Sequence, residues 1–180
     1  MQGLTGRFVE TVDWVSERLS RIASWCVLVS CAISAGNAMI RYGFNIGSNA
    51  WLELQWYLFA VTVFFGAPFL LKVNEHVRVD VLYVLRSGRG KAITDLLGLI
   101  FFFMPVCLAM IHLSINIVTD SWHVQEMSSS AGGLIRWPVK ALIPIGFVLL
   151  AIQGVVEIIK RVAFLRGTYD MDTHYEKPLQ

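Results

Sequence analysis

Long apolar runs separated by short polar segments dominate the pattern of this sequence. A helix that crosses a bilayer needs about 20 predominantly apolar residues. Runs of about that length are Ile22–Ile40, Leu52–Leu71, Ala92–Val118 and Val139–Ile159. The pattern therefore predicts an all-α integral membrane protein, with four transmembrane helices in a membrane domain over residues 22–165.

The segments that flank this domain carry a different pattern. Near the N-terminus, apolar residues recur at helical spacing among charges, at Phe8, Val12, Val15, Leu19 and Ile22. Residues 1–21 are therefore predicted to form an amphipathic helical extension. It could lie in the membrane interface or continue the first span into the cytoplasm. Residues 166–180 are polar and are predicted to form a cytoplasmic tail.

The distribution of lysine and arginine predicts the orientation, because these residues gather on the cytoplasmic side of membrane proteins. Of the 15 lysines and arginines, three lie in the loops after the first and third runs: Arg41, Arg136 and Lys140. The others lie in the two terminal segments and in the loop between the second and third runs. Both termini are thus predicted to be cytoplasmic.

The composition supports a membrane protein and argues against nucleic-acid binding and a disulfide framework. Only 16% of the residues are charged, against about 25% in typical soluble domains. The net charge of +2 is too small to indicate nucleic-acid binding. Cys26, Cys31 and Cys107 lie inside apolar runs, where they resemble small hydrophobic residues rather than a disulfide framework. Nucleophile motifs and phosphate-binding glycine loops are absent from the sequence, so neither an enzyme nor a cofactor is predicted.

Polar residues within the runs are predicted to gather at two depths. The outer layer would hold Asn37, Arg41, Glu53, Gln55, His112 and Asn116. The cytoplasmic layer would hold Lys72, Asp95, Gln153 and Glu157. Hydrogen bonding between helices, an ion or proton pathway and contact with a partner subunit would each explain such layers. Glu53 is expected to pair with Arg41 or to reach the interface.

Prolines, glycines and tryptophans add local expectations. Pro68, Pro105 and Pro144 each remove a backbone donor and favour a bend. Close helix approach is expected at Gly36, Gly66, Gly98, Gly146 and Gly154. An aromatic belt at the outer boundary is expected from Trp51, Trp56, Trp122 and Trp137.

The stretch VNEHVRVDV, residues 73–81, directly follows the second run. Its valines alternate as in a strand, but they also fit a helical face when the stretch is continued to Leu85. A short interfacial helix is the favoured interpretation, held at the anionic leaflet by the basic residues that follow. His76, Arg78 and Asp80 would then act as caps and local ion pairs.

Three motifs follow one another along the chain. They are WLELQWYLFA with Gly66 after it, HVRVDVL, and SWHVQEMSSSAGGLIRWPVKALIPIGFVLLAIQGVVEIIKR. Their order, over about residues 20–165, resembles the small membrane subunit of tripartite ATP-independent periplasmic (TRAP) transporters, the DctQ-like family. The residues that stand where the family pattern has similar ones are Trp137, Pro138, Lys140, Pro144, Gly146 and Gln153. One departure is that Leu54 and Gln55 follow Glu53, where the family often has two adjacent acids.

The resemblance implies a non-catalytic subunit of a sodium-coupled importer of organic acids in the bacterial inner membrane. Its partners would be a large permease subunit, a periplasmic solute-binding protein and membrane lipid. The small subunit would brace the large one and help to dock the binding protein. Residues expected to support structure or assembly are Glu53, Gly66, His76, Arg78, Asp80, Trp137, Pro138, Lys140 and Pro144. Those expected near the periplasmic partner are Arg41, Trp122 and Arg136.

Two other function classes stay open from the residues themselves. One is a self-contained small transporter with Glu53 as its proton site. Activity of this chain alone in liposomes would favour it, as would a buried rather than interfacial Glu53. The other is a haem or quinone anchor subunit of a membrane oxidoreductase, which would show a haem spectrum. His112 is the only histidine well inside a run, so a haem with two histidine ligands would need one from another chain.

Overall fold

A computed structural model describes residues 4–74 and 87–169 of the chain. The helices are α1 (Leu4–Phe44), α2 (Asn49–Val73), α4 (Gly88–Gly98), the π-helical segment η1 (Leu99–Phe103), α5 (Met104–His123) and α6 (Trp137–Leu165). Because α4, η1 and α5 follow one another directly, they form a single helical span. The described residues thus contain four helices long and apolar enough to cross a membrane, which confirms the predicted fold class.

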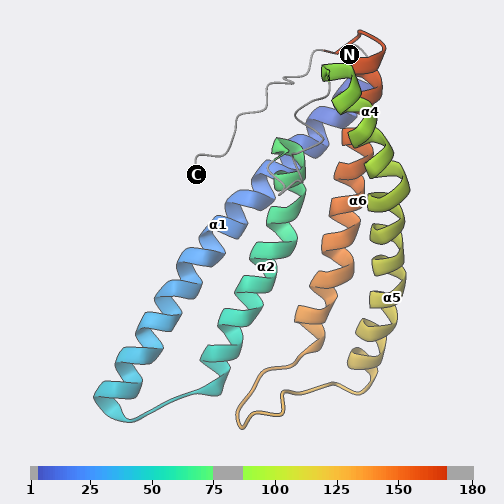
Figure 1. Cartoon of the computed structure of the whole chain (residues 1–180). Coiled ribbons are helices and arrows are strands. Elements are labelled where there is room, and N and C mark those ends of the chain that lie inside the picture. Colours follow the sequence, from blue (N-terminus) through green and yellow to red (C-terminus); the bar gives the residue numbers. More distant parts are fainter. Residues whose placement is uncertain (1–3, 75–86, 170–180) are drawn as a thin grey trace.

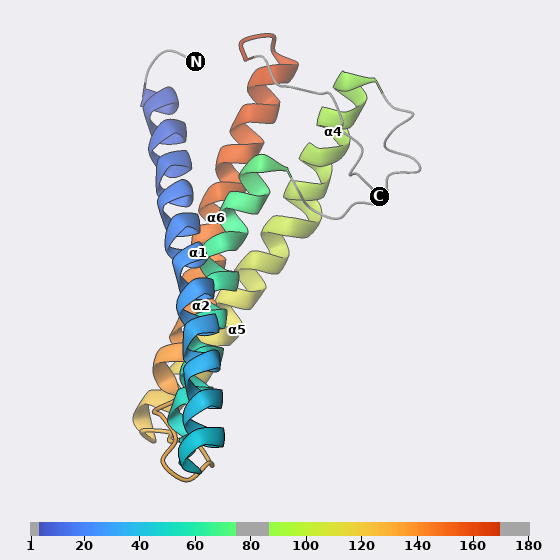
Figure 2. The same ribbon diagram turned by 90° about the vertical axis from the view of Figure 1, so that its left-hand side faces the viewer.

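The four spans stand side by side in the order α1, α2, α6 and α5 (Figure 1). We call the end that carries segments 45–48 and 124–136 the loop end. The opposite end, where α1 begins and α6 ends, is the terminal end (Figures 1 and 2). In this row α6 packs against α2 on one side and against α5 on the other, which makes it the most buried helix.

The N-terminal extension and the first span form one continuous helix, α1. The structure therefore favours continuation of the span over a separate interfacial helix. The predicted apolar face is only partly covered: Val12, Val15 and Leu19 are half-buried, and Phe8 and Ile22 are exposed. The fully buried positions are Val9, Ser16 and Ala23. Short side chains at a seven-residue spacing allow α1 to lie close against its neighbours.

The third span contains a local change of helical geometry before Pro105. The Met104 backbone N–H bonds to the Leu99 carbonyl, five residues earlier, which closes the π-helical turn. Pro105 then occupies one of the first two positions of α5 and contributes no backbone donor. A π-turn next to a proline is a common way to accommodate the missing hydrogen bond.

Two of the five glycines expected at close helix contacts carry such contacts. A Cβ at Gly146 would lie 2.4 Å from the Phe64 ring, and one at Gly154 would lie 2.7 Å from the Phe103 ring. At Gly36, Gly66 and Gly98 a Cβ would meet no described atom within 4 Å, so the expectation was wrong for helix packing inside this chain. A glycine marks a close helix contact only where a bulky side chain of the neighbouring helix fills the space that a Cβ would take.

Candidate functional site

Glu53 lies one turn into α2 at the loop end, and it is only 6% exposed. One carboxylate oxygen accepts a hydrogen bond from the Leu134 backbone N–H at 2.7 Å, and the other accepts one from the Ser128 hydroxyl. Both donors belong to the 124–136 loop. A buried carboxylate requires hydrogen-bond partners, and the loop supplies them from neutral groups.

Two further side chains of α2 contact the same loop. The Asn49 amide donates to the Ala131 carbonyl at 3.0 Å, and the Tyr57 hydroxyl donates to the Ile135 carbonyl at 2.7 Å. Asn49, Glu53 and Tyr57 are four residues apart, which places them on one face of the helix. Three successive turns of α2 therefore satisfy backbone groups of the loop.

Backbone hydrogen bonds within the loop give it a hairpin-like shape. The Ser128 N–H donates to the Leu134 carbonyl at 3.0 Å, and the Arg136 N–H donates to the Glu126 carbonyl at 2.9 Å. Gly133 fits inside the turn because it has no side chain. A Cβ at that position would lie 2.4 Å from the Ser128 Cβ and 2.9 Å from the Glu53 Oε1.

An aromatic pair joins the two helices that flank the loop, and a charged cluster joins the loop itself to α6. Lys140 forms a hydrogen-bonded ion pair with Glu126, and Arg136 lies 3.8 Å from the same carboxylate. The Lys140 hydrogen bond holds the pKa of the Glu126 carboxyl below its usual value. The Trp122 and Trp137 rings meet edge to face with centroids 4.4 Å apart. These contacts fix the end of α5 against the start of α6.

The structure separates the residues expected in the outer layer. Arg41 is exposed at the end of α1. Of the two alternatives offered for Glu53, pairing with Arg41 was wrong, since both Glu53 oxygens bond to the loop instead. His112 and Asn116 are exposed on α5 and do not join Glu53. The partners of Glu53 are instead the Leu134 backbone N–H, which carries no side-chain signal, and the Ser128 hydroxyl of a distant loop.

The prolines expected to support structure or assembly both lie in α6. Pro138 is the second residue of α6, where a missing N–H costs no helical hydrogen bond. Pro144 lies inside α6 and is half-buried. His76, Arg78 and Asp80 lie outside the described residues.

The terminal end holds a buried network of charges. Lys160 of α6 lies 2.8 Å from Asp13 of α1 and 2.9 Å from Glu157. Glu157 in turn pairs with Arg161 at 2.6 Å, and Arg161 is 3.4 Å from Asp95 of α4. Arg161 is only 2% exposed and Glu157 only 3%. The network therefore joins α1, α6 and α4 through charged side chains, of which those on α6 are buried and Asp13 and Asp95 are partly exposed.

Gln153 extends this network toward the membrane interior. It accepts a hydrogen bond from the Ser16 hydroxyl at 2.8 Å and donates one to Asp13 at 3.0 Å. Of the four residues predicted to share one layer, Gln153, Glu157 and Asp95 belong to one connected group, whereas Lys72 pairs separately with Glu17 of α1 at 2.6 Å.

Three members of the network were not singled out in the sequence. Asp13 was assigned to a surface extension, while Lys160 and Arg161 were counted as charges of the tail. The four-residue spacing of Gln153, Glu157 and Arg161 along α6 was the signal that could have revealed Arg161.

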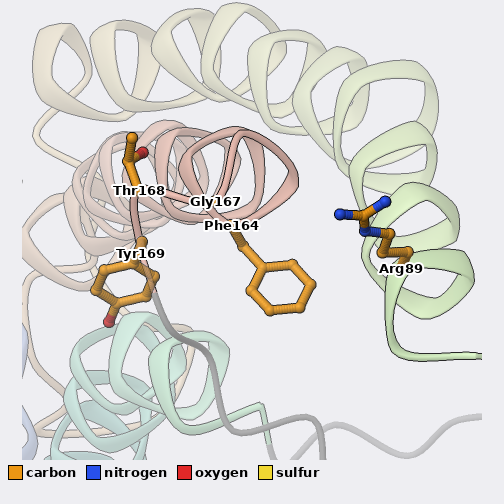
Figure 3. A pocket seen from close by; sticks show the side chains of 5 residues that line it. All are labelled: Arg89, Phe164, Gly167, Thr168 and Tyr169. Atoms are coloured by element: carbon orange, nitrogen blue, oxygen red, sulfur yellow. The ribbon is translucent and has the colours of Figure 1, made fainter.

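An open pocket of about 440 Å³ lies at the terminal end. Its lining residues are Arg89, Phe164, Gly167, Thr168 and Tyr169 (Figure 3). Arg89 stands across the opening from Phe164 and Tyr169, so the pocket offers one cation beside two aromatic rings. Across residues 4–74 and 87–169, no three His, Cys, Asp or Glu side chains gather as a metal site would require.

Comparison with known proteins identifies the family. The family described as tripartite ATP-independent periplasmic transporters, DctQ component, matches residues 30–164. The chain belongs to this family. The four apolar helices and this membership make it a multi-pass protein of the inner membrane.

A relative from Haemophilus influenzae, named a TRAP transporter small permease protein, is 34% identical to this DctQ chain over 85 residues. The match covers 45% of this chain and 53% of that protein, about half the length of each. No solved structure matches this chain. The loop-end cluster lies wholly within the family match, whereas Asp13, Ser16 and Glu17 lie before it.

Proposed function

We propose that this chain is the non-catalytic small subunit of a sodium-coupled TRAP transporter that imports an organic acid. In this proposal it braces a large permease subunit within the membrane. It also helps to dock the periplasmic binding protein that delivers the substrate. Both termini lie in the cytoplasm, so the loop end faces the periplasm.

The open row of helices supports the bracing role. A single row leaves broad apolar surfaces uncovered, including Trp25, Phe59, Phe101 and Phe102. Lipid or another membrane protein can cover such surfaces. The charged groups of the terminal end are meanwhile used to hold α1, α4 and α6 together. The polar groups therefore fix the shape of the chain, as a brace requires.

The 124–136 loop is the observation that carries the docking role. Hydrogen bonds with Asn49, Glu53 and Tyr57 of α2 hold this loop, while its tip, residues 129–132, is exposed. A surface that is ordered before binding loses less conformational entropy when a partner docks. The α2 contacts would thus preorganise a periplasmic surface for the binding protein.

Photo-crosslinking in membranes that contain all three components tests this role. Crosslinkers at Trp122, Ser130 and Arg136 should trap the binding protein. Crosslinkers at Arg89 and Lys91, at the terminal end, serve as matched controls and should not. Trapping from the terminal end alone would overturn both the docking role and the proposed orientation.

Transport measurements test the rest of the proposal. In liposomes, uptake of an organic acid should require sodium, the large subunit, the binding protein and this chain together. This chain alone should give no uptake. Uptake by the isolated chain would instead support a self-contained transporter.

A further inference from the structure

Three polar residues form a stripe along the exposed side of α5. His112, Asn116 and Asp120 are spaced four residues apart, which places them on successive turns of one helix face. All three are exposed. Among the described residues, their side chains make no hydrogen bond or ion pair with the rest of the chain. By contrast, neighbouring Ser114 donates to the Met110 carbonyl at 2.6 Å and is satisfied within its own helix.

The stripe runs deep into the membrane. The Trp122–Trp137 pair marks the membrane boundary at the loop end, where aromatic rings of this type gather. His112 precedes Trp122 by ten residues, which corresponds to about 15 Å along an α-helix. The hydrocarbon core of a bilayer is about 30 Å thick. His112 therefore lies near its middle, Asn116 lies between, and Asp120 is next to the interface.

Lipid is a poor neighbour for this face. Hydrocarbon offers no hydrogen bonds, so an amide or imidazole in contact with it loses the bonds that water would supply. The flanking Leu113, Ile115 and Ile117 are also exposed, and they suit a hydrophobic environment. A polar stripe between apolar flanks is instead typical of a contact between transmembrane helices.

We propose that the His112–Asn116–Asp120 stripe is the docking face for a transmembrane helix of the large permease subunit. This inference rests on the proposed function and adds the surface and its chemistry. The partner helix would present hydrogen-bonding side chains level with His112 and Asn116, and a lysine or arginine level with Asp120. A neutral imidazole offers one donor and one acceptor, and an amide offers both as well, so uncharged polar partners suffice at those depths.

Charge argues against a second copy of this chain as the occupant. Copies inserted in the same orientation and related by a two-fold axis through this face would bring equivalent positions together at equal depth. The two Asp120 carboxylates would then oppose each other and repel. A different chain that carries a cation at that level avoids this repulsion.

The test is the retention of the large subunit on this chain after detergent extraction. The double variant His112→Leu and Asn116→Leu removes the polar groups while it keeps apolar volume on an exposed helix face. An interhelical hydrogen bond changes the equilibrium constant for helix association by up to about tenfold. We therefore expect the double variant to retain the large subunit about tenfold more weakly than the wild type does. Asn37→Leu on α1 is the matched control and should retain the large subunit as the wild type does.

The outcomes separate this proposal from the broader one. If wild-type chain retains the large subunit and the double variant does so equally well, the stripe proposal fails while the proposed function stands. A photo-crosslinker at Asn116 should trap the large subunit, and adducts formed only with a second copy or with lipid would also overturn the stripe proposal. If the wild type retains no large subunit, the proposed function fails and the stripe proposal fails with it.

Discussion

The two ends of the helical row use buried carboxylates in opposite ways. At the loop end, Glu53 accepts hydrogen bonds from the neutral Leu134 N–H and the Ser128 hydroxyl. At the terminal end, Glu157 lies between the cations of Lys160 and Arg161. Both carboxylates are nearly inaccessible to solvent. The first therefore orders a loop through its backbone, whereas the second links helices through charge.

The loop-end carboxylate thus determines the shape of a surface loop, and the terminal-end carboxylate determines how the helices pack together. Loss of a loop-end contact releases one segment while the helices can stay in place. Loss of a terminal-end charge leaves an opposite charge buried with one ion-pair partner fewer, which destabilises the packing of α1, α4 and α6. The two ends should accordingly respond to mutation with different magnitudes and in different measurements.

The largest effect is expected at Arg161. Arg161→Leu removes the guanidinium that lies against Glu157 and Asp95, and breaking a buried ion pair in this way costs about 3–5 kcal/mol. Denaturant unfolding in detergent micelles, followed by circular dichroism, measures the loss. Arg166→Leu, at an exposed position just after α6, is the control and should stay within experimental error of the wild type. Equal stability of the two variants would contradict the assigned role of the network.

A smaller loss is expected at Gly133, confined to the loop end. Gly133→Ala places a methyl group against Ser128 and Glu53, and overpacking of this kind costs about 1–3 kcal/mol. Loop crosslinks to the binding protein should weaken while helix content is retained. Gly47→Ala, in the other loop of the same end, has open space around it and should behave as the wild type. Helix loss in Gly133→Ala would show that the loop and the helical row are not separable.

Sequence reasoning was most successful where a pattern extends over many residues. The four apolar runs predicted the four spans, and the helical spacing near the N-terminus predicted the helical extension of α1. These patterns report how a segment meets a bilayer, which depends little on the rest of the chain. Glu53 was singled out as well, but it was expected to pair with Arg41 or to reach the interface, whereas the structure buries it against the 124–136 loop.

Partners between distant segments could not be predicted in the same way. The donor to Glu53 is a backbone N–H 81 positions away, and backbone groups are identical in every residue. Lys160 was assigned to the tail because a count of charges does not distinguish a buried lysine from a solvated one. Gly66 and Gly146 look alike in sequence, yet only Gly146 has an aromatic ring against it.

Glu53→Gln should have a smaller effect than either preceding substitution. The amide oxygen can still accept the Leu134 N–H, but the bond loses its charge assistance, and the amide nitrogen replaces an acceptor for Ser128. Hydrogen exchange at the Leu134 amide should become several-fold faster, while exchange in α6 stays unchanged. Glu10→Gln, at an exposed acid on α1, is the control and should alter neither. Unchanged exchange at Leu134 would show that the charge of Glu53 does not order the loop.

The smallest effect expected is a response of the loop end to acid. Because the Lys140 hydrogen bond lowers the pKa of Glu126 from its usual 4.5, this pair stabilises the fold fully above that pH. The stabilisation should disappear as the pH falls through the lowered pKa. Acid titration with fluorescence from the Trp122–Trp137 pair, assigned by a Trp122→Phe variant, measures this loss of packing. Lys140→Met removes the hydrogen bond, so its transition should shift toward pH 4.5. A transition at the same pH in both proteins would show that another carboxyl is responsible.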